Sequence, residues 1–216
     1  MHEQPSIAFR RFIRGWFYDW HLIMLINQAI PRTAFEAYAE QSMHPRASHP
    51  DAVRDEAENI RQNLYRIVWT RLVDHFQTYL TNALFAILDR RPDLLAVASR
   101  AGGLKKPAKT VAEAARKIRG FERLQTVFAA IGVPLATSEE QRRIIAHGIK
   151  FRNLVVHAEG VDEEGEFIDT PDDAAGVDLI PGIVFDQLAG LEAAVRVVAE
   201  QTDALAIATF GIDSTQ

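Results

Sequence analysis

The chain has 216 residues, of which 48% are hydrophobic and 25% are charged, and this length and composition predict one globular domain, or one domain with helical additions, with a core of ordinary size. The formal net charge of −5 argues against a chain built as a whole for non-specific nucleic-acid binding, so any contact with RNA needs a local basic patch. The absence of cysteine excludes disulfides, thiolate metal sites and a cysteine nucleophile.

The N-terminal part of the sequence predicts two helices. Residues 6–29 form an aromatic-rich helical pattern, and Pro31 permits a second helix that ends near residue 42. The apolar run at residues 16–30 is interrupted by polar side chains and is too short to cross a bilayer. We therefore expect a core helix and a cytoplasmic protein without membrane contact. Residues 1–50 are expected to form an N-terminal helical extension.

A long central helix is predicted for residues 51–89. Apolar residues recur there at three- and four-residue steps, and no glycine or proline occurs before Pro92. At 1.5 Å per residue this helix would be about 58 Å long, which leaves a bend or a break within it open. Residues 51–216 are expected to form one helical domain around it.

The second half of the chain continues the helical pattern. A short helix is expected at residues 93–100, one or two helices at residues 110–131, and a last helix at residues 183–210. Residues 159–178 hold nine acidic residues and no lysine or arginine, and we expect an exposed loop there, with a short hairpin at residues 166–168. Because helical patterns dominate throughout, the predicted fold class is all-α.

The helix expected at residues 139–158 has two signals at its start. Thr137 precedes Glu140 by three residues, and Ser138 precedes Gln141 by three residues. Both pairs fit the capping box, in which each partner's side chain satisfies a backbone N–H group of the first turn. The sequence therefore predicts a well-defined helix start.

The end of this helix carries a compact set of chemical groups. Arg152, Asn153 and His157 lie within six residues of otherwise apolar sequence. Asn153 and His157 are four residues apart and share one face of the helix, and Arg152 lies about 140° from His157 around the axis. Arginine can hold a phosphate, and histidine can transfer a proton near neutral pH. These three residues are the candidate catalytic residues.

The spacing alone is weak evidence, because it occurs twice in the chain. Arg142 and His147 show the same separation earlier in the helix. Arg142 falls in the first turn, next to Arg143, where polar residues are expected on an exposed face. We interpret His147 as an ordinary surface or core histidine, as most single histidines on helices are.

The motif at residues 152–157, followed by Gly160 and Asp162, resembles the signature of the HEPN superfamily. Residues 72–80 also resemble the first long helix of these domains, and Pro92 resembles the proline that closes it. The resemblance implies an all-α, HEPN-like helical bundle, here with a long central helix and additional N-terminal helices.

Many HEPN domains are metal-independent endoribonucleases, whereas others are inactive or bind nucleotides and proteins. The resemblance implies that Arg152, Asn153 and His157 form such a site. Gln77 stands where many relatives carry an acidic residue after the phenylalanine of the long helix. Asp74, one turn earlier, could substitute, although an exposed helix charge is its more ordinary interpretation. No tyrosine follows His157, so the resemblance to the subgroup modified by a partner nucleotidyltransferase is weaker.

For such an enzyme we expect cleavage of RNA by its own 2′-hydroxyl, with no cofactor and no metal. No His-x-x-x-His pair is present. One arginine and one histidine supply only part of this chemistry, so a homodimer is expected to bring two sets to one composite site. His157 would act as acid or base, Arg152 would hold the scissile phosphate, and Asn153 would orient one of them.

A local excess of positive charge at residues 100–123 is the candidate RNA-binding surface. The residues assigned to it are Lys105, Lys106, Lys109, Arg116, Lys117 and Arg119. A solvated helix face is the alternative interpretation. The resemblance suggests a role in a toxin–antitoxin system or in antiviral defence, in which an antitoxin-like inhibitor protein could accompany the chain.

A second hypothesis is a catalytically inactive HEPN-type module that binds a protein or a nucleotide. The aromatic cluster at residues 16–20 could be its interface, although core packing is the usual role of aromatic residues. A metal-dependent hydrolase is poorly supported, because carboxylates and histidines do not cluster in the sequence.

Overall fold

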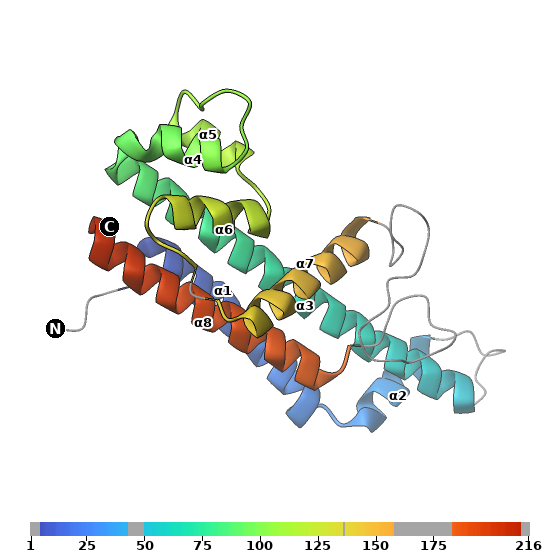
Figure 1. Cartoon of the computed structure of the whole chain (residues 1–216). Helices are drawn as coiled ribbons and strands as arrows, with labels where there is room; N and C mark the ends of the chain where they lie inside the picture. Colours follow the sequence, from blue (N-terminus) through green and yellow to red (C-terminus); the bar gives the residue numbers. More distant parts are fainter. Residues whose placement is uncertain (1–4, 43–49, 136, 158–182, 213–216) are drawn as a thin grey trace. The chain divides into compact units, whose positions relative to one another are not determined.

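A computed structural model describes residues 5–42, 50–135, 137–157 and 183–212, and no strand occurs in these ranges (Figure 1). The elements are α1 (Ile7–Met24), the π-helical turn η1 (Leu25–Ala29), α2 (Arg32–Ser42), α3 (Pro50–Arg90), the 3-10 turn η3 (Pro92–Leu94), α4 (Leu95–Ala101), α5 (Val111–Lys117), α6 (Phe121–Ala130), α7 (Glu139–His157) and α8 (Phe185–Phe210). The all-α prediction is confirmed. In the described ranges, no helix is both long enough and apolar enough to cross a membrane.

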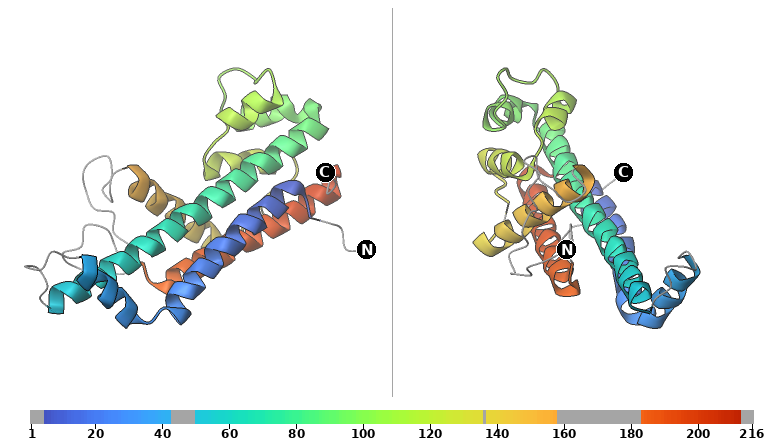
Figure 2. Two further views of the ribbon diagram at one scale, coloured as in Figure 1. Left: turned by 180° about the vertical axis from the view of Figure 1, so that it is seen from behind. Right: turned by 90° about the vertical axis from the view of Figure 1, so that its right-hand side faces the viewer.

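The long helix α3 has no break. It runs through 41 residues, and both views in Figure 2 show it as one continuous helix. The absence of glycine and proline explains its continuity, because neither a flexible backbone position nor a lost hydrogen bond interrupts the ladder. Most of its predicted apolar stripe is buried, but Ile67 is 51% exposed.

Tertiary contacts divide the chain into two units. Unit 1 comprises residues 1–16, 73–146 and 191–216, and unit 2 comprises residues 17–72 and 147–190. Helices α1, α3, α7 and α8 each contribute to both units. Each unit therefore combines segments that lie far apart in the sequence. The division into an N-terminal helical extension at residues 1–50 and a helical domain at residues 51–216 stays a prediction.

The core of unit 1 is aromatic. Phe12 of α1 lies edge-on to Phe76 of α3, with their ring centroids 6.4 Å apart, and Phe76 also contacts Phe121 of α6 at 6.0 Å. The hydroxyl of Tyr79 donates a hydrogen bond of 2.9 Å to the carbonyl of Ala199 in α8. The segment that resembles a long HEPN helix therefore supplies core residues here, as its apolar spacing predicts.

The start of α1 is attached to α8 within unit 1. Ser6 caps α1, because its hydroxyl accepts a hydrogen bond from the backbone N–H of Phe9. Asp203, which is buried, accepts hydrogen bonds from both the backbone N–H and the hydroxyl of Ser6. Burial raises the pKa of Asp203 above its ordinary value, although both hydrogen bonds from Ser6 oppose the rise.

The sequence between α3 and α7 forms the short helices of unit 1. The sequence predicts one or two helices at residues 110–131, and the structure has two, α5 and α6. They are separated at Gly120, whose φ of +89° is readily adopted only by glycine. Helix α4 packs against α5 and α6. The expected last helix is also present as α8, and its start at residue 185 is two residues later than predicted.

Unit 2 is held together by polar contacts between distant segments. Gln62 of α3 exchanges two hydrogen bonds with the backbone of Ile183, of 2.7 and 3.2 Å. Arg71 of α3 pairs with the buried Asp19 of α1 at 2.6 Å. Segments that precede α3 in the sequence and segments that follow it are therefore both attached to α3.

Candidate functional site

Helix α7 begins with one of the two predicted capping boxes. The backbone N–H of Gln141 donates to the hydroxyl of Ser138 at 3.1 Å, and the backbone N–H of Ser138 donates to the amide oxygen of Gln141 at 2.9 Å. The hydroxyl of Thr137 is used elsewhere, since it accepts a hydrogen bond of 3.2 Å from the side chain of Gln125. The capping signal is therefore confirmed for Ser138.

The rotation of the C-terminal half of α7 is determined by its contact with α3. The indole N–H of Trp69 donates a hydrogen bond of 3.0 Å to the carbonyl of Gly148. The Trp69 ring also packs on the buried ring of Phe151, with centroids 5.1 Å apart. Because Phe151 and Gly148 face α3, residues on the other side of α7 are directed away from this contact.

Two of the three candidate catalytic residues have described side chains. Asn153 is exposed and Arg152 is half-buried, and the guanidinium of Arg152 donates a hydrogen bond of 3.2 Å to the amide oxygen of Asn153. The neighbouring Val156 is 47% exposed. This part of α7 is therefore accessible, and the amide of Asn153 contributes to the position of the arginine.

His157 is the last residue of α7, and its side chain lies outside the described ones. Its position in the helix is four residues after Asn153, so the two positions are neighbours on the helix surface. Gly160, Asp162 and the acidic residues 159–178, including the hairpin expected at residues 166–168, lie outside the described residues.

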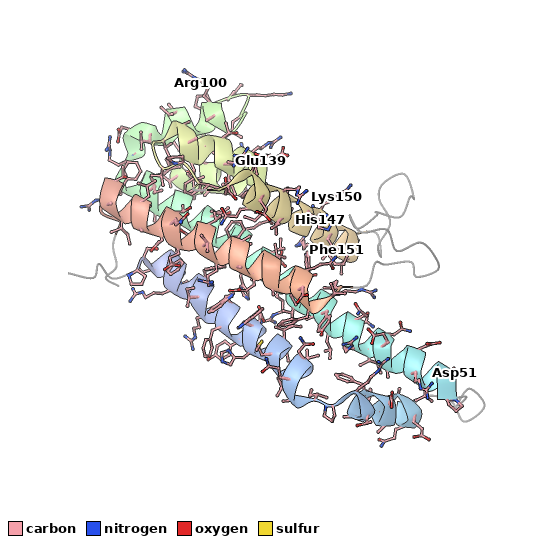
Figure 3. All side chains as sticks on the ribbon, turned by 60° about the horizontal axis from the view of Figure 1, so that its bottom comes forward. Asp51, Arg100, Glu139, His147, Lys150 and Phe151 are labelled. Carbon is pink, nitrogen blue, oxygen red and sulfur yellow. The ribbon has the colours of Figure 1, made fainter. Side chains whose placement is uncertain are left out.

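His147 and Lys150 occupy successive turns of α7 (Figure 3). His147 is half-buried, and its pKa is lowered, chiefly because burial penalises the charged imidazolium and secondarily because Lys150 repels it. Lys150 is exposed. Sequence reasoning assigned no role to Lys150, although its three-residue spacing from Asn153 already places both on neighbouring positions of one helix.

Asp74, the candidate carboxylate on α3, and the candidate catalytic motif belong to different units. Asp74 and Gln77 are both partly exposed and lie in unit 1, whereas Arg152 and Asn153 lie in unit 2. A supporting role for Asp74 therefore stays a hypothesis.

The predicted RNA-binding residues are all exposed and belong to unit 1. These are Lys105, Lys106, Lys109, Arg116, Lys117 and Arg119. Their charges are not equally available to a ligand. Lys117 forms an ion pair of 2.7 Å with Glu113, and this hydrogen bond is the main cause that lowers the pKa of the Glu113 carboxyl.

The loop that carries the first three of these lysines is anchored to α4. Ser99 is fully buried; its carbonyl accepts a hydrogen bond from the backbone of Leu104, and its hydroxyl accepts one from the backbone of Ala108, each of 3.0 Å. We call residues 104–109 the lysine loop. Its ends are held by these contacts, while Lys105 and Lys106 between them are exposed.

The part of the chain that the structure describes contains no group of three or more histidine and acidic side chains suited to a metal ion. Comparison with family models, with curated proteins and with solved structures finds no match to this chain. The HEPN resemblance therefore rests on the sequence motifs alone, and membership of that superfamily is part of the proposal below.

Proposed function

We propose that this protein is a metal-independent endoribonuclease of the HEPN type, with a composite site formed by two copies of the chain. The observation that supports it is the arrangement on α7. Phe151 fixes the helix against Trp69, while Arg152 and the exposed Asn153 are hydrogen-bonded to each other beside the position of His157. A cation and an imidazole at the accessible end of a helix suit a phosphodiester substrate.

The chemistry uses the nucleophile that RNA already carries. A base takes the proton of the 2′-hydroxyl, the 2′-oxygen bonds to phosphorus, and the bond from phosphorus to the 5′-oxygen breaks as an acid protonates that oxygen. The products are a 2′,3′-cyclic phosphate and a 5′-hydroxyl. Arg152 stabilises the negative charge on the phosphorane oxygens, and Asn153 orients Arg152.

The need for both an acid and a base explains the proposed dimer. Each copy supplies one His157, and a two-fold axis places the same residue of both copies on opposite sides of one site. One imidazole then removes the 2′-proton while the other, protonated, donates to the leaving oxygen. Neither step requires a metal or a cofactor.

The lysine loop is the proposed contact for the RNA strand outside the site. Lys105, Lys106 and Lys109 form no ion pair among the described residues, so their charges can neutralise phosphates. Their contribution is independent of base sequence and weakens as salt increases.

The test is incubation of a labelled RNA with the protein in EDTA. We expect cleavage with 2′,3′-cyclic phosphate ends, and loss of cleavage in His157→Ala and Arg152→Gln. His21→Ala is the matched control, because His21 is an exposed histidine of α1 outside the proposed site. Equal cleavage by the wild type and His157→Ala would disprove the assignment, and so would cleavage that EDTA abolishes.

A second candidate function, a protein-binding module, is favoured by one surface of unit 2. Phe17 and Tyr18 of α1 and Leu25 of η1 are exposed by 47, 60 and 50%, whereas Ile23 of α1 and Ile26 of η1 are buried. Exposed aromatic clusters of this kind mark interaction sites. Of the predicted aromatic cluster, Trp20 instead packs on another ring of unit 2, that of Phe185, at 6.0 Å.

The two candidate functions differ in their measurable properties. A protein that stays monomeric and leaves RNA intact, but loses a binding partner when Phe17 and Tyr18 are replaced by serine, would be the binding module. An antitoxin-like inhibitor is one partner that such a surface could take, and its capture would not by itself contradict ribonuclease activity.

A further inference from the structure

Lys150 shares the accessible side of α7 with two positions of the proposed site, those of Asn153 and His157. From Lys150, Asn153 lies about 60° away around the helix axis and the position of His157 about 20° away. All three positions lie on the side of the helix away from Phe151 and Gly148, which contact Trp69. Along the axis, Lys150 precedes Asn153 by about 4.5 Å, or nearly one turn.

The charge of Lys150 is available to a ligand. The side chain is exposed, and no carboxylate within the described ranges forms an ion pair with it. Its field nevertheless reaches its neighbours, because it contributes to the lowered pKa of His147 one turn earlier. A lysine of this kind is a compact point charge, which suits a phosphate oxygen approached from any direction.

We propose that Lys150 binds the phosphate next to the scissile one, so that α7 contacts two successive phosphates of an RNA strand. Arg152, whose guanidinium is hydrogen-bonded to Asn153, holds the phosphate that reacts, and Lys150, nearly one turn before Asn153, holds its neighbour. This inference rests on the proposed ribonuclease function for the identity of the first phosphate. It adds a binding residue that the sequence motif does not contain.

The binding test uses a single-stranded oligonucleotide with 2′-O-methyl groups, which cannot be cleaved because the nucleophile is blocked. Fluorescence anisotropy at several salt concentrations gives the affinity and its salt dependence. We expect Lys150→Gln to weaken binding and to reduce the slope of log K against log salt by about 0.7, the value for one phosphate contact on a single strand. Lys150→Arg should restore both quantities.

Arg54→Gln is the matched control. It removes the same charge from an exposed side chain of unit 2, and Arg54 is engaged with Asp51 on α3 at 3.5 Å. We expect this variant to bind as the wild type does. An equal loss in Lys150→Gln and Arg54→Gln would overturn the inference, because the effect would then come from net charge alone.

A cleavable RNA separates the inference from the proposed function. If the wild type cleaves RNA, Lys150→Gln should raise KM and leave kcat unchanged, because the neighbouring phosphate is bound equally in the ground state and the transition state. Cleavage with an unchanged KM in Lys150→Gln overturns the inference alone. Binding that depends on Lys150, without cleavage by the wild type, overturns the proposed function and supports the inference as a phosphate contact.

Discussion

Replacement of Trp69 by phenylalanine tests how α7 is held in place. The substitution removes the indole N–H that donates to Gly148 at 3.0 Å, which costs about 1 kcal/mol of unfolding free energy. The smaller ring also leaves part of a fully packed volume beside Phe151 empty, which costs about 1 kcal/mol more. We therefore expect Trp69→Phe to lower the free energy of unfolding by about 2 kcal/mol.

The assay is urea unfolding followed by far-UV circular dichroism, with Trp20→Phe as the matched control. Trp20 is half-buried in the same unit, and its contact is a ring stacked on Phe185 at 6.0 Å, so the control should lose less than about 1 kcal/mol. A difference below about 0.5 kcal/mol between the two variants would refute the reasoning that Trp69 fixes the rotation of α7.

Three further predictions concern single side chains. Because burial raises the pKa of Asp203, this residue stabilises the fold most below the unfolded-state pKa near 3.8, and the stabilisation decreases as pH rises through the folded-state pKa. In thermal melts at several pH values, Asp203→Asn should make the melting temperature fall less over this pH range than it does in the wild type. A larger fall in the variant would contradict the explanation. Lys150→Gln should raise the pKa of His147 in an NMR titration, because one of the two causes of its depression is removed; an unchanged pKa counts against their interaction. In chemical unfolding, Ser138→Ala should lower the free energy of unfolding by about 1 kcal/mol, and Ser138→Asp should retain the wild-type value. Equal stability of the two variants would show that the side chain at residue 138 does not cap α7.

Much of the fold follows from local sequence patterns. The uninterrupted three- and four-residue spacing of apolar side chains at residues 51–89 predicts α3 almost to its ends, and the break at Gly120 follows from a backbone conformation that favours glycine. Local rules do not choose between overlapping signals. Thr137 and Ser138 both fit a capping box, and only the tertiary hydrogen bond from Gln125 to Thr137 explains why Ser138 is the cap.

The candidate site was predictable only in part, for a similar reason. Spacing places Asn153 and His157 on one side of a helix, but the accessibility of that side depends on the contact of Phe151 with Trp69, two residues far apart in the sequence. Lys150 carries no motif of its own, so its relevance emerges only once that rotation is known. The half-burial that lowers the pKa of His147 likewise depends on packing and not on spacing.

The division of α3 between two units is also a tertiary property. The apolar repeat of this helix continues without change across Leu72 and Val73, where one unit ends and the other begins. Helical periodicity therefore predicts the element and gives no information about which partners each half contacts.

In the proposed enzyme, two copies of the chain bring the ends of their α7 helices to one phosphodiester. The chain has no cysteine, so Val156→Cys, at an exposed position within the motif, provides a single attachment point for a spin label. Pulsed electron paramagnetic resonance should then give one short, narrow distribution of distances between the labels of two copies, at protein concentrations that cleave RNA. Absence of any dipolar coupling under those conditions would contradict the composite site.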